Sequence, residues 1–306
     1  MKKILVILGP TGSGKTELAK LVYDNIPSRI ISIDSAMVYR GMDIGTAKPT
    51  PSELKLYPHD LVDVCDPLDD FSVADCVAAV KSLLLLAEQE DKLPILVGGS
   101  MMYHYILQSG MHVMPSSPKN IRQEVENEFL AKGLLYKWEK LLRYDPEFAV
   151  RVEKNDKQRI HRALELSLQG YKTTALQFGC RSLPIQRYEF LNFGLGFADR
   201  SLLYASLDHR FDQMLAEGFI EEVSWLIAKD NDIVNSAAFR SIGYRQIASY
   251  VLGEIAKDEA VRQSKTATRR FAKRQITWSK KFNFNDLSSL SGSERLRLIK
   301  DKVLEY

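Results

Sequence analysis

The sequence has 306 residues, of which 45% are hydrophobic and 26% are charged. A chain of that length and composition can bury one large core or two smaller ones, which excludes a globally disordered protein. The formal net charge of +3 is too small to indicate a nucleic-acid partner, so such a partner has to be inferred from where the charges lie.

The cysteines and the apolar runs predict a cytoplasmic protein without a membrane partner. Cys65, Cys76 and Cys180 form no C-x-x-C pair, and we interpret them as reduced thiols that pack as small apolar residues. No apolar run exceeds five residues, which is far below the length that spans a bilayer. Residues 2–8 resemble the start of a signal peptide, but they end in glycines rather than in a cleavage site. We expect a monomer.

The N-terminal segment contains a phosphate-binding motif. Residues 4–8 are an apolar run that leads directly into Gly9-Pro-Thr-Gly-Ser-Gly-Lys-Thr16, and a helical pattern follows. This is the G-x-x-x-x-G-K-[ST] loop, in which backbone N–H groups and one lysine surround a diphosphate. The N-terminus of the helix adds its partial positive charge to the same site. The motif predicts phosphate binding and leaves open whose phosphates are bound.

Asp34 ends the next predicted strand, residues 29–34. A parallel strand commonly ends at the ligand-binding edge of its sheet, so we expect Asp34 beside the phosphate loop. The alternative is a turn or helix-capping aspartate, which is the commoner fate of this residue type at a strand end. Residues 35–49 mix glycine, aromatic and basic residues and are typical of a binding loop. Residues 61–64 are predicted to form another short strand.

A second strand–glycine–helix unit follows. Residues 71–90 are predicted to form a helix capped by Ser72 with Asp75 three positions later. Residues 94–100, PILVGGS, run into a further helix over 101–107. Two such units predict a parallel sheet whose loops meet at one edge. Ser100 stands at a helix start, where an ordinary N-cap is the commoner role.

The middle of the chain is helical and is followed by one more strand. Residues 119–168 contain no strand pattern and are divided by Gly133 and by Asp145-Pro146. Residues 188–197 are predicted to return to the sheet. The fold class is therefore α/β: a P-loop parallel sheet flanked by helices, with an inserted all-helical subdomain. We expect a core of residues 1–114 and 185–306 and an insertion of residues 115–184, which acts either as a lid or as a fixed layer.

The C-terminal third is helical and contains the most polarised segment. Helices are predicted over 199–217, to 227, to 252 and over 291–306, the first with Leu202, Leu203, Leu207 and Phe211 on its apolar face. Residues 262–281 hold eight Lys or Arg and no Asp or Glu. Arg262, Lys265, Arg269 and Lys273 share one helical face. A charge run is usually a solvated face, but the missing acidic residues favour a polyanion.

Three protein classes are weighed on these features. A regulatory GTPase is excluded because its N-K-x-D and D-x-x-G motifs are missing. A small-molecule kinase and a nucleic-acid-dependent transferase stay open. The five histidines show no metal-ligand spacing. A metal here would be Mg²⁺ on the diphosphate, with the Thr16 hydroxyl as a ligand.

The chain resembles the bacterial tRNA dimethylallyltransferase family, also called isopentenyltransferases. The longest match is Asp34-Ser-Ala-Met-Val-Tyr-Arg-Gly-Met-Asp-Ile-Gly-Thr-Ala-Lys-Pro49. The matching motifs also include the phosphate loop, residues 97–100, Asn155-Asp-Lys-Gln-Arg-Ile-His-Arg162, Gly243-Tyr-Arg-Gln246 and Ala272-Lys-Arg-Gln-Ile-Thr-Trp278. They occur in order over nearly the whole chain.

The resemblance implies a reaction and its participants. The dimethylallyl group moves from dimethylallyl diphosphate to N6 of adenosine 37, just 3′ of the anticodon, in tRNAs that read codons beginning with U, and diphosphate is released. Asp34 is the general base, and Ser100, Lys15 and Arg210 (or alternatively Arg200) complete the catalytic set. The donor is held by Thr11, Gly12, Ser13, Gly14, Lys15 and Thr16.

The partner implied by the resemblance is the anticodon stem-loop of tRNA. Its contacts are Asp34, Ser35, Ala36, Met37, Ser100, Arg122, Gln158, Arg159, Ile160, His161, Arg162, Arg240, Ser241, Ile242, Gly243, Tyr244, Arg245, Lys273, Arg274, Gln275, Trp278 and Lys280. Two of these positions depart from the family pattern. Ser100 replaces the usual threonine and keeps its hydroxyl, and Met37 stands where glutamine is usual.

Overall fold

The computed structural model describes residues 2–112, 114–174, 181–182, 185, 187–197 and 199–305. These residues form two compact units, one of Met1–Gln108 with Ile185–Tyr306 and one of Ser109–Pro184. The predicted insertion, residues 115–184, falls within the second unit. That unit includes residues before 115 because β5 (Met111–His112) pairs with β6 (Arg181–Ser182) at its base. Cys180 lies outside the described residues.

The first unit contains a six-stranded parallel sheet in the order β3-β2-β4-β1-β7-β8. This confirms the α/β class and the return of the predicted strand 188–197 to the sheet. The strands are β1 (Lys2–Leu8), β2 (Ser28–Ser32), β3 (His59–Asp60), β4 (Leu93–Val97), β7 (Tyr188–Gly194) and β8 (Asn285–Asp286).

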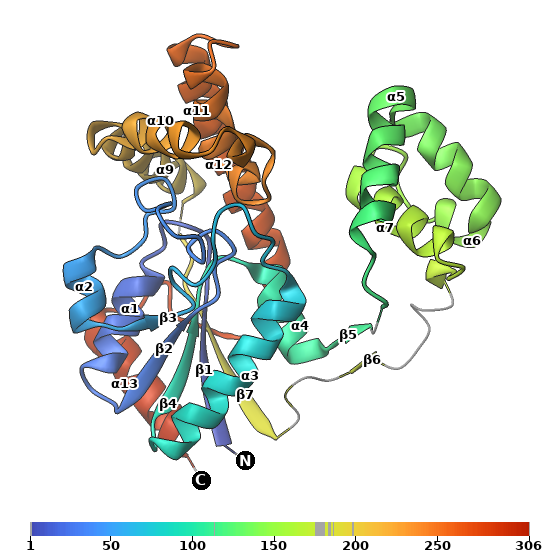
Figure 1. The fold of residues 1–306 in the computed structure, drawn as a ribbon. Coiled ribbons are helices and arrows are strands. Elements are labelled where there is room, and N and C mark those ends of the chain that lie inside the picture. The colour runs from blue at the N-terminus through green and yellow to red at the C-terminus, as the bar shows by residue number, and fades with distance from the viewer. Residues whose placement is uncertain are drawn as a thin grey trace. The chain divides into compact units, whose positions relative to one another are not determined.

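Helices cover both faces of the sheet (Figure 1). The helices of this unit are α1 (Lys15–Tyr23), α2 (Pro51–Leu56), α3 (Val73–Gln89), α4 (Met101–Ser109), α9 (Arg200–Ala216), α10 (Phe219–Lys229), α11 (Tyr244–Val251), α12 (Lys257–Ser279) and α13 (Gly292–Leu304), with 3₁₀ turns η1 (Asn231–Asn235) and η2 (Ala238–Arg240). Strand β1 is buried on both sides. Ile4, Val6 and Leu8 face the cluster that contains α3 and α4, whereas Leu5 and Ile7 face α1 and α13.

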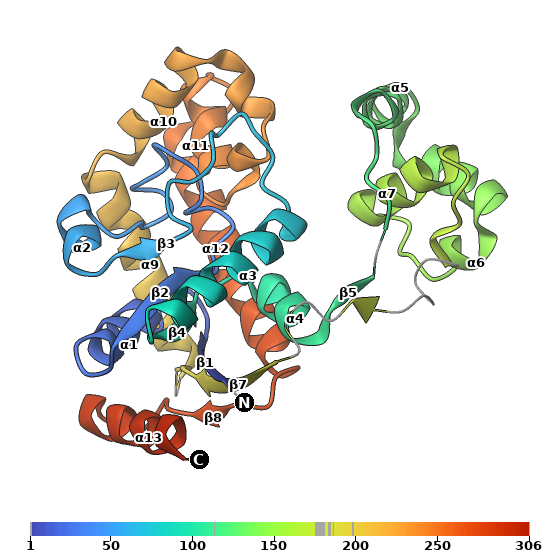
Figure 2. The ribbon, with the colours of Figure 1, turned by 60° about the horizontal axis from the view of Figure 1, so that its bottom comes forward.

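Most predicted helix boundaries are observed, and the predicted capping box is present. Ser72 and Asp75 form the predicted capping box of α3, and Ser291 caps α13 with Glu294 in the same way. Figure 2 shows that α13, which lies near the C-terminal end of the sequence, is beside β8. The cysteine interpretation is also confirmed where the structure describes it, because Cys65 and Cys76 are buried free thiols.

Two local predictions are wrong. The third strand is His59–Asp60, and residues 61–64 form a turn in which Leu61 and Asp63 have φ of 63° and 56°. Left-handed backbone breaks an extended strand, and single-sequence periodicity does not reveal it. Leu202 was expected on the apolar face of α9, but it is 61% exposed while Leu203 and Leu207 are buried.

The second unit is a small helical bundle, described here by itself. It comprises α5 (Lys119–Tyr144), α6 (Pro146–Ala149) and α7 (Lys157–Leu168), and Gly133 breaks α5 with φ 78° as predicted. Its core includes Val125, Leu141 and Ile160. Asp145 caps α6 and also accepts a hydrogen bond from the Thr174 backbone at 3.1 Å. The predicted lid motion stays a prediction.

A helical layer formed by α9, α10, α11 and the start of α12 holds the loop after β2. The carboxylate of Glu222, on α10, accepts hydrogen bonds from the backbone N–H groups of Asp43 (2.9 Å), Ile44 (2.7 Å) and Gly45 (3.3 Å), and from the Tyr244 hydroxyl (2.5 Å). Burial and the neighbouring carboxylate raise the pKa of Tyr244. One acid therefore fixes three consecutive backbone donors of the binding loop.

Replacing Glu222 by Ala should destabilise this layer, because four hydrogen-bond donors lose one anionic acceptor. We expect a loss of about 2–4 kcal/mol in the free energy of unfolding, measured by urea denaturation, and faster hydrogen exchange of amides 43–45. Glu221→Ala is the matched control, since that neighbouring acid is exposed and should cost less than about 1 kcal/mol. Equal stability of the two variants would contradict this assignment.

Candidate active site

The carboxyl ends of three adjacent strands meet at the candidate site. Strands β2, β4 and β1 are neighbours in the sheet, so the loops that follow them lie at one edge. The backbones that follow two pairs of neighbouring strands, β4 with β2 and β1 with β7, approach too closely for side chains. A Cβ on Gly98 would lie 2.1 Å from the Ile33 carbonyl oxygen, and one on Gly9 would lie 2.4 Å from the Leu195 carbonyl oxygen. Glycine is required at both positions.

The loop after β1 adopts the shape of an anion site. Gly12 and Gly14 have φ of 79° and 80°, a left-handed conformation that glycine adopts without strain. Gly14 is the N-cap of α1, and no side chain caps the first turn of that helix. The N-terminal N–H groups of α1 are therefore available to a ligand, and the helix dipole favours a negative one.

Lys15 is folded back over this loop. Its side chain is 9% exposed, and its ammonium donates a hydrogen bond to the Pro10 carbonyl at 2.7 Å. The pKa of Lys15 is lowered to about 8, mainly by burial, with the Asp34 carboxylate opposing the shift and the positive charge of Arg210 adding to it. Lys15 is thus a desolvated cation at neutral pH, and its interaction with a bound anion would be favourable.

Asp34 makes turn contacts and also lies beside the phosphate loop. Its Oδ1 accepts hydrogen bonds from the backbone of Ala36 (2.9 Å) and Met37 (3.4 Å), which is the turn-capping alternative. The carboxylate also lies within the electrostatic reach of Lys15 and Arg210. Asp34 is therefore at the phosphate loop, as the position of its strand predicted.

Ser100 does not act as an ordinary N-cap. Its Oγ accepts a hydrogen bond from the Ser35 backbone N–H at 2.9 Å and donates one to the Ser35 Oγ at 3.1 Å. The expected bond to the first turn of α4 is replaced by this contact because the loop after β2 lies across the helix start. Ser100 thus fixes the residue that follows Asp34.

Arg210 reaches the phosphate loop from α9. Its Nη1 lies 3.5 Å from the Thr11 hydroxyl, and burial lowers its pKa while Asp34 raises it. The alternative residue, Arg200, begins the same helix, but its side chain lies outside the described part of the chain. Among the two arginines considered from sequence, Arg210 is the one that the described structure brings to the loop.

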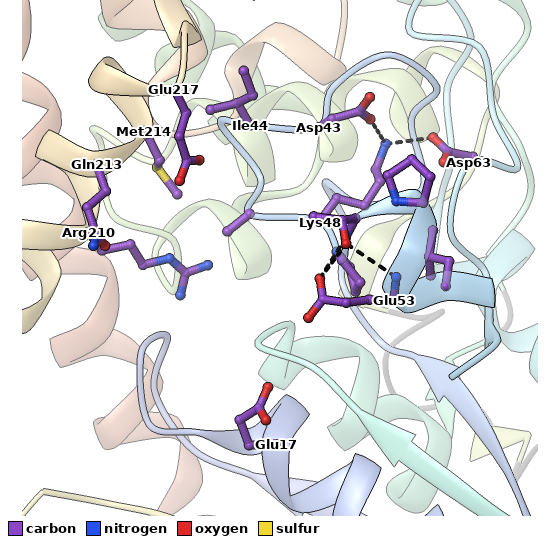
Figure 3. A pocket seen from close by; sticks show the side chains of 15 residues that line it. Glu17, Asp43, Ile44, Lys48, Glu53, Asp63, Arg210, Gln213, Met214 and Glu217 are labelled. Carbon is purple, nitrogen blue, oxygen red and sulfur yellow. Dashed lines mark hydrogen bonds and ion pairs between the residues drawn. The ribbon is translucent and has the colours of Figure 1, made fainter. Parts of the chain in front are cut away.

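A cavity of about 690 Å³ adjoins Arg210, with Glu17, Asp43, Ile44, Ala47, Lys48, Pro49, Thr50, Pro51, Glu53, Leu54, Asp63, Gln213, Met214 and Glu217 as its other lining residues. Figure 3 shows Arg210 extending from α9 into it, opposite Glu17 of α1. The Lys48 ammonium is already bound to Asp43 (2.5 Å) and Asp63 (2.6 Å). Arg210 is therefore the cation in this lining that is left to meet a ligand beside the phosphate loop.

A second cavity, of about 560 Å³, is strongly basic. Its lining consists of Arg240, Ile242, Arg245, Gln246, Arg262, Gln263, Thr266, Ala267, Arg270 and Arg274. Five guanidinium groups line it without an acidic residue, which is a typical environment for phosphate groups. Sequence analysis missed Arg270, although its position within the basic run of α12 could have revealed it.

The prediction of an unbalanced basic face on α12 is wrong for three residues. Arg262 pairs with Glu259 at 2.6 Å, Lys265 with Asp212 at 2.6 Å and Arg269 with Asp208 at 2.6 Å. Two of these acids lie on α9, which packs beside α12, so the sequence of α12 could not reveal them. Arg270, Lys273 and Arg274 are exposed and form no ion pair with any residue that the structure describes.

The residues predicted to contact tRNA differ in their exposure to solvent. In the first unit Arg240, Arg245 and Lys280 are exposed, and Ser241, Ile242 and Trp278 are half-buried. In the second unit Arg122, Gln158 and Arg159 are exposed. Ser35 is exposed beside Asp34, where Ala36 and Met37 are half-buried.

Several side chains in these stretches are not available to a nucleic acid. Ile160 and Tyr244 are 0% exposed and belong to the cores of their units, so the predicted contacts cannot involve their side chains. Gly243 and Gln275 are also buried. Arg162 donates to Glu165 at 3.0 Å and to the Pro115 carbonyl.

His161 is neutral in this structure. Burial lowers its pKa to about 4, with a further effect of Lys137 that Glu126 opposes, and its Nδ1 lies 3.3 Å from Glu126. Its ring packs edge-on against Phe129. His161 therefore offers an uncharged contact rather than a phosphate-binding cation.

Together, the sheet order, the loop after β1 and the buried lysine define a P-loop α/β protein with a helical insertion. Comparison with known proteins identifies the family within this class. The family model described as IPP transferase matches residues 37–282, and the chain belongs to this family.

Relatives and solved structures agree with that assignment. A tRNA dimethylallyltransferase of Dichelobacter nodosus is 40% identical over 278 residues, covering 91% of this chain and 87% of the relative. One from Legionella pneumophila (strain Corby) is 41% identical, covering 90% and 88%. The tRNA isopentenylpyrophosphate transferase structure from Bacillus halodurans has a TM-score of 0.71 at 31% identity, covering 99% of this chain and 96% of that one. These matches do not support the small-molecule kinase alternative.

No helix among the described residues combines the length and apolarity needed to cross a membrane.

The pKa of Lys15 predicts how anion binding depends on pH. Affinity for inorganic diphosphate should be full below pH 8 and should fall as the pH rises through about 8, approaching tenfold per pH unit once Lys15 is mostly neutral. Lys15→Arg should flatten this dependence, because a guanidinium stays protonated. Calorimetric titration between pH 7 and 10 measures both proteins.

Lys20→Arg is the control, since Lys20 lies on the same helix but is paired with Glu17 and Glu53. It should follow the wild-type curve. A wild-type affinity that is constant over this range, or an unchanged slope in Lys15→Arg, would refute the role of Lys15.

Proposed function

We propose that this chain is a tRNA dimethylallyltransferase that moves a dimethylallyl group from its diphosphate to N6 of adenosine 37, just 3′ of the anticodon, in tRNAs reading codons that begin with U. The observation that carries this proposal is the meeting of Asp34, Lys15 and Arg210 at one sheet edge in a member of the IPP transferase family. A prenyl transfer needs a base for the acceptor and cations for the leaving group, and these residues supply both. A monomer acting in the cytoplasm is part of the same proposal.

The donor diphosphate is proposed to bind in the loop of residues 11–16. The N–H groups at the start of α1 and the ammonium of Lys15 lie at this loop, and Arg210 reaches it from α9. As the C1–O bond of the donor breaks, negative charge accumulates on the diphosphate. Cations that are already desolvated stabilise this charge without further reorganisation.

A magnesium ion fits this loop only together with the diphosphate. Thr16 is half-buried in the first turn of α1, and the described residues contain no group of three His, Cys, Asp or Glu side chains that could hold a metal. Mg²⁺ commonly keeps several waters and binds through one or two protein groups and substrate phosphates. Thr16 would be the protein ligand, and the ion would neutralise phosphate charge.

Asp34 is proposed to accept the proton from the N6 amine. An exocyclic amine is a weak nucleophile, so a carboxylate that takes its proton as the N6–C1 bond forms lowers the barrier. One Asp34 oxygen is held by the turn of residues 36–37, which leaves Oδ2 on the side of Gly99. Ser100 fixes Ser35 and thereby the backbone that carries Asp34.

The tRNA backbone is proposed to lie on the basic cavity and on the exposed end of α12. Arg270, Lys273 and Arg274 are exposed there, and Arg240 and Arg245 line the same cavity. Phosphate contacts of this kind give affinity and orientation without reading sequence. Arg122, Gln158 and Arg159 of the helical unit belong to the same proposal, because that unit also presents exposed polar residues.

Transfer activity tests the function. Wild-type protein incubated with dimethylallyl diphosphate, Mg²⁺ and unmodified tRNA should yield prenylated adenosine, detected by mass spectrometry of digested tRNA. Asp34→Asn keeps the size and the turn contact but loses the base, so the rate should fall by about 10²–10⁴-fold. Asp66→Asn is the control, because Asp66 caps a similar turn through Leu68 outside the site.

Failure of the wild-type protein to prenylate tRNA, together with phosphorylation of a small metabolite by ATP, would establish the kinase instead. Wild-type turnover that is matched by Asp34→Asn would remove Asp34 from the mechanism. A protein that binds tRNA equally well with and without Asp34 and never turns over would be a tRNA-binding protein only.

Salt dependence tests the tRNA surface. The double variant Arg270→Ala/Arg274→Ala should bind more weakly to tRNAs of any sequence. The slope of log K against the logarithm of the salt concentration should flatten by about 1–2. The control removes two exposed arginines from another region, Arg187→Ala/Arg297→Ala, and should leave the slope unchanged. An equal slope in both double variants would place the tRNA elsewhere.

A further inference from the structure

Gln275 occupies an unusual place on the basic helix α12. It is 3% exposed, while its neighbours Lys273 and Arg274 are exposed. Its side-chain amide reaches two loops that are distant in sequence. Oε1 accepts a hydrogen bond from the Thr11 backbone N–H at 2.9 Å, and Nε2 donates one to the Gly99 carbonyl at 2.8 Å. One buried amide thus joins the loop after β1, the loop after β4 and the helix.

A neutral amide makes both of these bonds with one side chain because it carries a donor and an acceptor. A carboxylate at this position would face the Gly99 carbonyl oxygen without a proton to donate, and an ammonium would face the Thr11 N–H without a lone pair. Gly99 is matched to the amide in shape as well. A Cβ on Gly99 would lie 2.5 Å from Nε2 of Gln275. A larger residue at position 99 would therefore collide with the Gln275 amide. An ionised side chain at position 275 would lose one of the two hydrogen bonds.

The two bonded loops carry the two halves of the reaction. Thr11 begins the donor-binding stretch, and its hydroxyl lies 3.5 Å from Arg210. Gly99 precedes Ser100, whose hydroxyl holds Ser35 next to Asp34. A continuous path of hydrogen bonds and adjacent residues therefore runs from the phosphate loop through Gln275 to the backbone of the proposed base.

We propose that Gln275 is a positioning residue that fixes the phosphate loop relative to Asp34, and not a residue that contacts tRNA. This inference rests on the proposed prenyl transfer, in which the donor carbon and the acceptor amine have to be aligned by these two loops. Reactive alignment is sensitive to small displacements, and an error of about 1 Å can cost on the order of 10²-fold in rate. Gln275 acts on the chemistry through Thr11 and Gly99 and touches neither substrate.

The test separates alignment from stability and from tRNA affinity. Gln275→Met removes the amide with little change in length, and Gln275→Glu keeps the acceptor for Thr11 but loses the donor to Gly99. Single-turnover prenyl transfer, tRNA affinity and thermal stability are measured for each. We expect the transfer rate at saturating substrates to fall by about 10²-fold in both variants, with tRNA affinity within about threefold of wild type.

Gln108→Met is the matched control. Gln108 also forms two amide hydrogen bonds between separate elements, to Asn192 at 2.9 and 3.1 Å, but it contacts neither loop of the site. It should lose a similar amount of thermal stability and keep its rate within about twofold. Rates that fall equally in Gln108→Met and Gln275→Met would show general destabilisation and overturn the proposal. A Gln275→Met defect confined to tRNA affinity would also overturn it.

A double-mutant cycle and hydrogen exchange complete the design. Gly99→Ala pushes the amide aside, so Gly99→Ala and Gln275→Met should each slow transfer while their combination slows it no further. Additive losses in transfer rate would contradict a shared clamp, by which we mean the hydrogen bonds of Gln275 to Thr11 and Gly99. If the wild-type protein transfers no prenyl group, the proposed function fails, and the clamp is judged by hydrogen exchange. The Thr11 amide should then exchange at least about tenfold faster in Gln275→Met than in Gln108→Met, and equal exchange would refute the clamp.

Discussion

The close approach of backbones at the strand ends is the constraint on which this structure depends. Gly98 lies against the carbonyl of Ile33, and Gly9 lies against that of Leu195, at separations where any Cβ would collide. The first contact joins the loops after β4 and β2, and the second joins the loops after β1 and β7, which are also neighbouring strands. A parallel sheet thereby brings together residues that are distant in sequence, and its edge is where such folds bind ligands.

Desolvated charge is the second organising feature. Lys15 is buried and Arg210 is half-buried, desolvation lowers the pKa of both cations, and Asp34 opposes that shift in each. Two cations near one carboxylate leave an excess of positive charge beside the phosphate loop. Burying such groups is unfavourable in the absence of a partner. The proposed diphosphate would supply that partner, which relates the electrostatics of this loop to the chemistry of the proposed ligand.

Helix α12 serves different functions on its different faces. Arg262, Lys265 and Arg269 are ion-paired, the latter two with acids of α9, and stabilise the packing of the helical layer. Arg270, Lys273 and Arg274 remain exposed to a polyanion. Gln275 turns inward to the two catalytic loops. In the proposed function a single helix contributes stability, tRNA affinity and positioning, because helical periodicity directs neighbouring residues to separate surroundings.

The sequence by itself determined the α/β class, the phosphate loop, the place of Asp34 at a strand end and the capping box of α3, because these features depend on local periodicity and on short motifs. Only the tertiary structure decided the roles of Ser100, Gln275, Glu222 and the ion-paired residues of α12. Their partners come from other elements, as Asp208 and Asp212 do for α12, and no local pattern encodes such distant contacts. The burial of side chains also depended on the tertiary structure. Ile160 and Tyr244 were expected to contact tRNA, but their side chains pack into the cores.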